Sequence, residues 1–531
     1  MSVLFTAISH TRDNPVQKQD VQKVLDQIGV SLDPKEENDF HALLAAVHDC
    51  AEEIQQLPDY QPIPDRDLYP RKDIHRPSKE EQVFGHAWAY KFLIRGTIGA
   101  GLLSGKTVCL KDVVAVADVP QLYGTDIFPP WTPITDATVV TRVLDAGANV
   151  VGTTTCENMC HSTSSFTSAQ GTVENPFAIG YSAGGSTSGG AAIVGGGLAD
   201  IAIGTDQGGS IRIPSAFCGC VGFKPTHGLV PYTGISSGDA IDDHAGPIAK
   251  SVLDVALCLD SISGYDGIDD RSLGAPTHGS TTYSSSMQAQ HGSLDGFKVG
   301  ILTEGFSHPI VDQRVRQVVL EAAYKFKTLG ATVDEVSIPG HLRGPGLWTI
   351  QQRIAGSQNL LGHQHGRRGL YLTELEQCRL PWTTESFRRG FAATKNVIIN
   401  GLYLADRFPG LYGKATNQGR QLREAYEKVF EQYDVLLMPT APIVAPRHGE
   451  KGSPMEALKP SMGITINTAI FNVTGHLAMT IPVGFAPSNE ETHVKLPVGM
   501  QIVGGLWKED KILRAGYAWE KAFNWKQEVL N

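Results

Sequence analysis

Two Gly-Gly-Ser steps supply the residues of this sequence best suited to acyl-transfer chemistry. Ser186 ends the first step, and Ser210 ends the second within the stretch GTDQGGSIRIP. Glycine before a reactive atom lets the backbone approach a substrate closely, and successive N–H groups at a turn into a helix can bind an anion. Such N–H groups stabilise the oxyanion that forms when serine attacks a carbonyl carbon. The pattern fits a nucleophilic serine, although two ordinary tight turns would give the same letters.

The base that would activate such a serine is not obvious among the histidines. His161, His227 and His244 are the nearest in sequence, and each could serve a Ser-His-Asp triad or be a structural residue. The stretch GISSG matches the Gly-x-Ser-x-Gly nucleophile motif at Ser236, but Pro231 interrupts the run before it and no apolar helix follows. We therefore expect that Ser236 is not the nucleophile.

Lys111 is the remaining polar candidate for the base. It ends the apolar run TVCLK, which predicts a strand that carries its amine toward the interior. Because burial disfavours the charged ammonium, such a lysine can accept a proton. An ion pair with the neighbouring Asp112, or an exposed position at the end of the strand, is the alternative, and spacing alone does not decide between them.

No metal or cofactor is expected. Cys156 and Cys160 lie in CENMCH, and Cys218 and Cys220 lie in CGC, but neither spacing is that of paired zinc ligands. The glycine-rich segment also lacks a Gly-x-Gly-x-x-Gly motif after a strand and a Lys-Ser or Lys-Thr step that would end a phosphate-binding loop.

The composition favours a globular enzyme of small molecules. The chain has 531 residues, is 41% apolar and carries a net charge of -10 without long runs of one sign, which argues against nucleic acid or an anionic membrane as a partner. Eight scattered cysteines are typical of a reducing compartment, so we expect a cytoplasmic protein. Neither a secretory signal nor a membrane span is expected, because no basic segment precedes an apolar core and no long apolar run occurs.

The elements that must position these residues alternate between helices and strands. A helix is predicted at 187–196 and a strand at 199–204, so Ser186 and Ser210 each lie at an element junction. The same alternation recurs around a helix predicted at 312–329 and indicates an α/β fold.

The first 85 residues have a different pattern. Apolar residues at helical spacing predict a helix at 36–57, and the next 22 residues contain five prolines and predict an extended linker. We expect a helical extension with its linker at 1–85 and a catalytic domain at 86–531.

The motifs, taken in order, resemble those of the amidase signature hydrolases from about residue 103 to 513. The blocks are LKD with Lys111, GGSTSGG, GTDQGGSIRIP, GFKPTHGLVP, YDVLLMPTAP, FNVTGHLAMTIPVG and LPVGMQIVG. The resemblance implies a large mixed β-sheet flanked by helices on both faces. The sequence departs slightly from the family at Thr187, which takes the place of a second serine but keeps a hydroxyl group.

The resemblance implies a Ser-cisSer-Lys triad. Ser210 would be the nucleophile, Ser186 the bridging serine after a cis peptide bond, and Lys111 the base. The oxyanion would be bound by the backbone N–H groups of Gln207, Gly208, Gly209 and Ser210. The surrounding loop would be supported by Thr205, Asp206 and Arg212, and the acyl pocket would be lined by Cys160 and His161.

The implied activity is hydrolysis of carboxamides to carboxylic acid and ammonia through an acyl-enzyme. Within the family, the motifs are most similar to those of broad-specificity amidases of the nitrile-degradation type and of fungal relatives that cleave urethane. Alternatives are a carbamate or aryl-acylamide hydrolase with the same triad, and the glutaminase-type subunit of a tRNA-dependent amidotransferase, which needs protein partners. The N-terminal extension implies a homodimer, and the substrate would be a small amide or carbamate.

Overall fold

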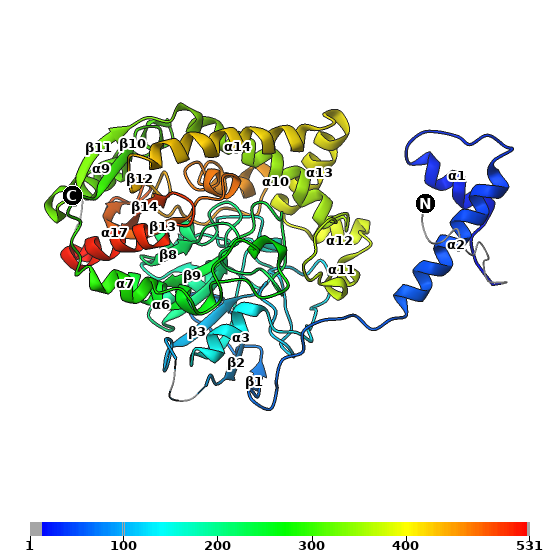
Figure 1. Cartoon of the computed structure of the whole chain (residues 1–531), viewed down its shortest axis with the longest axis horizontal. Helices are drawn as coiled ribbons and strands as arrows, with labels where there is room; N and C mark the ends of the chain where they lie inside the picture. Colours follow the sequence, from blue (N-terminus) through cyan, green and yellow to red (C-terminus); the bar gives the residue numbers. More distant parts are fainter. Residues whose placement is uncertain (1–12, 98, 100, 528–531) are drawn as a thin grey trace. The chain divides into compact units, whose positions relative to one another are not determined.

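The contacts in the computed structural model divide the chain into two compact units, 1–61 and 62–531, of which residues 13–97, 99 and 101–527 are described (Figure 1). The first unit contains α1 (Lys18–Asp26) and α2 (Glu37–Gln55). Helix α2 confirms the helix predicted from the apolar periodicity at 36–57. Its buried residues are Ala45 and Ala46, and α1 has none.

The proline-rich segment is not wholly a linker, because β1 (Lys72–His75) lies within it and pairs antiparallel with β2 (Trp88–Ile94). Pro70 and Pro77 stand outside the strand. Strand β1 is also the edge of the sheet, the position where missing N–H donors are tolerated. The proline spacing thus concealed a short strand.

The second unit is built on one mixed sheet of twelve strands, in the order β1-β2-β4-β3-β7-β9-β8-β13-β14-β12-β10-β11 (Figure 1). The remaining strands of this sheet are β3 (Thr107–Lys111), β4 (Asn149–Thr154), β7 (Ile201–Thr205), β8 (Val221–Lys224), β9 (Ala245–Ala249), β10 (Lys298–Leu302), β11 (Thr332–Val336), β12 (Val435–Pro439), β13 (Ala478–Pro487) and β14 (Lys495–Gly504). Strand β3 is parallel to both of its neighbours, β4 and β7, whereas β7 is antiparallel to β9. A two-stranded sheet pairs β5 (Glu174–Asn175) with β6 (Ala178–Ser182).

The helices of this unit are α3 (Thr138–Asp145), α4 (Ser188–Gly195), α5 (Arg212–Phe217), α6 (Val252–Ile262), α7 (Tyr283–Ala289), α8 (Glu304–Ser307), α9 (Gln313–Tyr324), α10 (Gly344–Leu360), α11 (Thr373–Arg379), α12 (Thr384–Arg389), α13 (Ala392–Arg407), α14 (Leu411–Phe430), α15 (Pro454–Leu458), α16 (Ile470–Val473) and α17 (Glu509–Ala522). Helix α4 and strand β7 confirm the elements predicted around the two serines. Helix α9 and the 3-10 turn that follows it occupy the helix predicted at 312–329.

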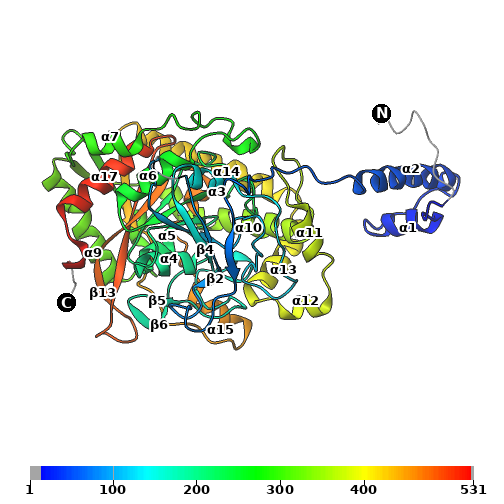
Figure 2. The ribbon, with the colours of Figure 1, turned by 90° about the horizontal axis from the view of Figure 1, so that it is seen from below.

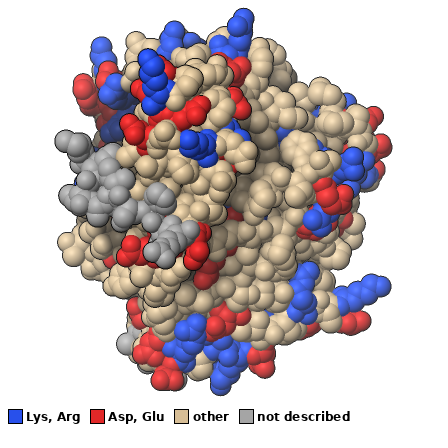
Figure 3. Space-filling model, turned by 90° about the vertical axis from the view of Figure 1, so that its right-hand side faces the viewer, with Lys and Arg blue, Asp and Glu red and all other residues tan. Residues whose placement is uncertain are grey.

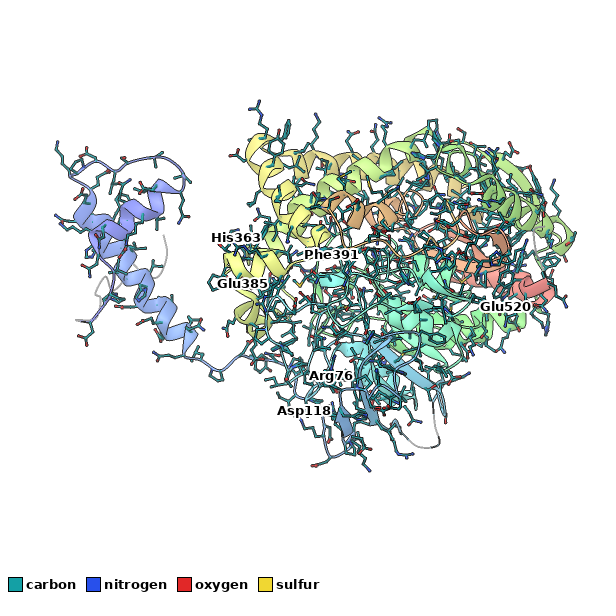
Figure 4. The ribbon with its side chains drawn as sticks, turned by 180° about the vertical axis from the view of Figure 1, so that it is seen from behind. Arg76, Asp118, His363, Glu385, Phe391 and Glu520 are labelled. Atoms are coloured by element: carbon teal, nitrogen blue, oxygen red, sulfur yellow. The ribbon has the colours of Figure 1, made fainter. Side chains whose placement is uncertain are left out.

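Alternating side chains of β3 face two different apolar clusters. Val108 and Leu110 pack in the cluster that contains the buried faces of α3 and α6, whereas Cys109 packs in a second cluster with α4. Because successive strand residues point to opposite sides, helices cover both faces of the sheet, as expected (Figure 2). Glu520 of α17, labelled in Figure 4, accepts the backbone N–H of Val252 at the start of α6, 3.1 Å away, and this bond ties the two helices together.

The charged side chains on the face drawn in Figure 3 are interspersed, and no extended patch of one sign is visible among the described residues of that face. In the described part of the chain, no helix has both the length and the apolar character to cross a bilayer.

Candidate active site

The amine of Lys111 lies at the carboxyl end of β3, in the interior of the second unit. Its Nζ is 2.8 Å from Ser186 Oγ and 2.7 Å from Thr205 Oγ1, and the Thr205 carbonyl oxygen is 3.5 Å away. The side chain is completely buried. Strand β3 therefore carries the amine inward, as predicted from its apolar run, and places it against the first of the two serines.

The ion pair between Lys111 and Asp112 does not form. The Asp112 carboxylate instead accepts the backbone N–H groups of Leu122 and Tyr123, each at 2.9 Å. Burial raises the pKa of Asp112 to about 8. Asp112 thus shapes the loop after β3 and does not pair with the amine.

Ser186 stands between a cis peptide bond and helix α4. The bond between Gly185 and Ser186 is cis, as the resemblance implies. Gly185 is confined on both sides, because a Cβ there would lie 2.8 Å from Glu157 Cγ and 2.9 Å from the carbonyl oxygen of Ser162. The Ser186 carbonyl accepts the N–H of Glu157 at 3.3 Å. The glycine before this serine is therefore required by close packing.

Ser210 lies in the short loop between β7 and α5 and is 8% exposed. The N–H of Thr187 donates to its carbonyl oxygen at 3.3 Å, which holds the two serine segments side by side. Among the hydrogen bonds of the described residues, none joins the hydroxyl groups of Ser186 and Ser210. Gly209, just before the nucleophile candidate, has a φ of 132°, a conformation that other residues adopt only with strain.

A buried ion pair between Asp206 and Arg212 supports this loop. Arg212 Nη2 donates to Asp206 Oδ1 at 2.8 Å, and both side chains are inaccessible to solvent. Burial would raise the pKa of Asp206, but the adjacent guanidinium outweighs it and holds that pKa well below its ordinary value. Arg212 also donates to Gln501 and Asn472, at 2.8 and 2.7 Å. Its position matches the expectation that it pairs with Asp206.

The backbone N–H groups of the loop are not equivalent. The N–H of Gly209 donates to Asp206 Oδ1 at 2.7 Å. The N–H groups of Gln207, Gly208 and Ser210 have no acceptor in the described residues. Three of the four predicted oxyanion donors are therefore available, and the fourth holds the loop.

Two residues that the sequence did not single out fix the orientation of these peptides. Trp348 Nε1 on α10 donates to the carbonyl oxygen of Gln207 at 2.7 Å, and Thr468 Oγ1 donates to that of Gly208 at 2.7 Å. Because the carbonyl and the following N–H belong to one rigid plane, holding the carbonyl of Gln207 also aims the N–H of Gly208. Trp348 belongs to none of the quoted motifs, and Thr468 lies just before FNVTGHL, so neither carried a local signal.

Ser210 lines a cavity of about 470 Å³, together with Cys160 and His161. Both predicted pocket residues therefore face the same space as the serine. His161 Nδ1 lies 3.3 Å from Thr394 Oγ1. Burial, and then the positive charges of Arg353 and Arg379, lower the pKa of His161 to about 3. This imidazole is neutral at physiological pH.

The other candidate residues do not contact the two serines. His227 Nε2 is 2.9 Å from the carbonyl oxygen of Ala240, and His244 Nδ1 is 2.8 Å from that of Asp242. Ser236 is not followed by a helix and lines a smaller cavity of about 60 Å³, which adjoins that of Ser210 and shares Cys160 and His161 with it. Within the ranges that the structure describes, no group of three or more His, Cys, Asp or Glu side chains could hold a metal ion.

Comparison with known proteins identifies the family. The family model described as Amidase matches residues 94–513. An enantioselective amidase of Rhodococcus rhodochrous is 38% identical over 446 residues, which cover 82% of this chain and 83% of that protein. A glutamyl-tRNA(Gln) amidotransferase subunit of Halothermothrix orenii is 33% identical over 429 residues, covering 80% and 86%.

A solved structure agrees with these matches. The peptide amidase from Stenotrophomonas maltophilia superimposes with a TM-score of 0.63 at 27% identity, covering 80% of this chain and 83% of that one. A match of this extent, with the mixed sheet and the order of motifs, shows that the chain belongs to the amidase signature family and is a hydrolase of carbon–nitrogen bonds.

Proposed function

We propose that this chain hydrolyses linear carboxamides to a carboxylic acid and ammonia, with Ser210 as nucleophile, Ser186 as bridging serine and Lys111 as base. The observation that carries the proposal is the buried Lys111 amine, 2.8 Å from Ser186 Oγ and without a carboxylate partner among the described side chains. An amine in such a place can exchange a proton directly with the Ser186 hydroxyl, because the two groups are within hydrogen-bond distance.

The contacts of the amine support a proton relay. A neutral amine has two N–H groups and one lone pair. The Oγ1 and carbonyl oxygen of Thr205 can accept the two N–H groups. The lone pair then remains for the hydroxyl proton of Ser186, and the Ser186 oxygen can accept the proton of Ser210. Thr205 is thus a positioning residue that acts through Lys111.

The chemical steps balance with these residues alone and one water. Ser210 Oγ bonds to the amide carbon while its proton passes to Ser186 and the Ser186 proton passes to Lys111, and the carbonyl oxygen becomes an oxyanion. The N–H groups of Gln207, Gly208 and Ser210 are free to bind it. The carbon–nitrogen bond then breaks, the relay returns the proton to the leaving nitrogen, and ammonia departs. Water cleaves the resulting ester by the same relay and restores the serine.

The same steps would serve a carbamate or an aryl acylamide, with a different leaving group. The similarity to the amidotransferase protein of Halothermothrix orenii supports a second candidate, a glutaminase that works only within a larger assembly. A panel of butyramide, benzamide, acetanilide, ethyl carbamate and glutamine, incubated with the purified chain alone, distinguishes these activities. We expect ammonia from the simple amides, and none with the Ser210→Ala variant. If the chain alone released ammonia or amine from none of these compounds, the proposal would be refuted.

We also propose that the chain forms a homodimer through its first unit. Helices α1 and α2 expose several apolar side chains, and Val24, Phe40 and Ile54 are 54%, 43% and 62% accessible. Faces of this kind mark interaction surfaces. In light scattering, the full-length chain should have the mass of two copies, and the double variant Phe40→Lys, Ile54→Lys should have the mass of one. A wild-type mass of one copy would contradict the proposal.

We propose a cytoplasmic location because the cysteines are unpaired. All eight are free thiols, and five of them are buried. Unpaired thiols in this number fit a reducing compartment. Fractionation of cells that express the chain would test this.

A further inference from the structure

The cavity beside Ser210 has one cationic side chain in its wall. Among the residues that line it, Arg353 is the cation, and no aspartate or glutamate is present. Apolar side chains, including Trp348, Leu458, Met462 and Ile466, make up much of the rest. A single uncompensated cation in a largely apolar wall is a feature that a neutral substrate would not need.

Arg353 lies on α10 and is incompletely satisfied. Its Nη1 donates to the side-chain oxygen of the neighbouring Gln352 at 2.7 Å, while its buried Nε has no hydrogen-bond partner. No ion pair to Arg353 occurs in the described residues. Burial lowers the pKa of its guanidinium. The charge of Arg353 is thus partly desolvated and unpaired.

A second arginine near the same histidine is accounted for differently. Arg379 donates to the side chain and to the carbonyl oxygen of Asn359, at 3.0 and 2.6 Å, and lies 3.5 Å from Glu376. The buried Nε of Arg379 also lacks a partner, but Arg379 has a carboxylate nearby and does not line the cavity beside Ser210. Neutral His161 adds no positive charge to the wall. Arg353 is the group left to meet an anion from outside the chain.

A partly buried cation is stable in a protein chiefly when it is paired, and the planar guanidinium matches a carboxylate with two parallel hydrogen bonds. If the chain hydrolyses amides as proposed, the carbonyl group of the scissile amide must reach Ser210 in the same cavity. We infer that Arg353 binds a carboxylate at the far end of the substrate, so that monoamides of dicarboxylic acids are a preferred substrate class. The apolar walls then hold the methylene groups between the two ends. This inference rests on the proposed function.

The experiment compares acids with neutral amides of similar shape. The acids are succinamate, glutaramate and adipamate, and in the neutral partners an isopropyl group replaces the carboxylate: 4-methylpentanamide, 5-methylhexanamide and 6-methylheptanamide. For the best chain length, kcat/KM of the wild type should be at least tenfold higher for the acid, mainly through KM. Arg353→Gln should reduce this ratio at least tenfold, and Arg353→Lys should retain part of it. Both substrates are measured on one preparation, so the ratio does not depend on the folded fraction.

A matched control and a binding measurement separate the outcomes. Arg316→Gln removes an exposed cation of α9 outside the cavity and should leave the ratio unchanged. Calorimetry with glutarate needs no turnover, and it should show binding to the wild type that weakens at least tenfold in Arg353→Gln. A wild type that prefers the neutral amides, or an acid preference that survives in Arg353→Gln, overturns the inference while amide hydrolysis stands. If none of the six amides is hydrolysed, the proposed function is refuted instead. In that case, glutarate binding that is absent, or that Arg353→Gln leaves unchanged, also overturns the carboxylate site.

Discussion

Replacing Thr205 by valine tests whether the Lys111 amine is held for proton transfer. Thr205 Oγ1 lies 2.7 Å from Lys111 Nζ and makes the shortest hydrogen bond to it. Valine keeps the branched shape of threonine and removes only this acceptor. The hydroxyl is buried within strand β7, so the change exposes no surface and the fold should persist.

The expected loss follows from the charge that develops on the amine. As Lys111 takes up a proton it becomes an ammonium, a stronger donor, so its bond to Thr205 is strongest in the transition state. Hydrogen bonds to charged groups contribute about 1.5–3 kcal/mol. Each 1.4 kcal/mol changes a rate about tenfold, so kcat should fall about 10- to 150-fold in Thr205→Val. KM should change little, because Thr205 acts on the amine and not on the substrate.

The assay is ammonia release from a simple amide, with Thr153→Val as the control. Thr153 lies on β4, which pairs with the other side of β3, and is equally buried, but its hydroxyl has no hydrogen-bond partner. Its replacement should leave kcat within about twofold of the wild type, since no hydrogen bond is lost. A Thr205→Val enzyme within threefold of the wild type, or an equal loss in both variants, would refute the relay geometry.

Two further changes test the surroundings of the serines. Burial raises the pKa of Glu157 to about 7 from an ordinary value of 4.5. Between these pH values the folded state therefore keeps a proton that the unfolded chain loses. The free energy of unfolding should decrease as the pH rises from 4.5 to 7, by up to about 3 kcal/mol. In urea unfolding, the stability of Glu157→Gln relative to the wild type should therefore increase from pH 5 to pH 8. A difference in the free energy of unfolding that does not change with pH would contradict this. Trp348→Phe keeps an aromatic ring but removes the hydrogen bond to the Gln207 carbonyl. Because the N–H of Gly208 is then less well oriented toward the oxyanion, kcat should fall about 5- to 20-fold. An unchanged kcat would show that this hydrogen bond is not needed to orient the loop.

The local elements around the serines could be predicted because their signals are local. Helix α4 and strand β7 begin and end within two residues of the predicted bounds, since small residues followed by an apolar run identify them without long-range information. Strand β1 was missed because its pairing with β2 outweighs the prolines on either side. Its stability comes from a partner strand that local propensity does not describe.

The meeting of Lys111 with Ser186 could not be derived from spacing, because 75 residues separate them. Strand order supplies the missing information. Strands β3 and β7 are parallel neighbours, with Leu110 opposite Ile203, so the residues at their carboxyl ends, Lys111 and Thr205, lie at the same edge. The motifs of the family identify these residues without the sheet order. Trp348 and Thr468 reach the loop through tertiary packing and left no pattern to recognise.

The ion pair of Asp206 and Arg212 explains why the loop that carries the proposed nucleophile depends on the C-terminal part of the chain. Burying two charges costs free energy unless further hydrogen bonds satisfy them. Asp206 is satisfied by backbone N–H groups of its own loop, whereas Arg212 is completed by Asn472 and Gln501, 260 and 289 residues farther along. The network that holds Ser210 is therefore complete only after α16 and β14 have packed beside α5. The serine is positioned by the finished sheet, and a partly folded chain cannot present it in the same geometry.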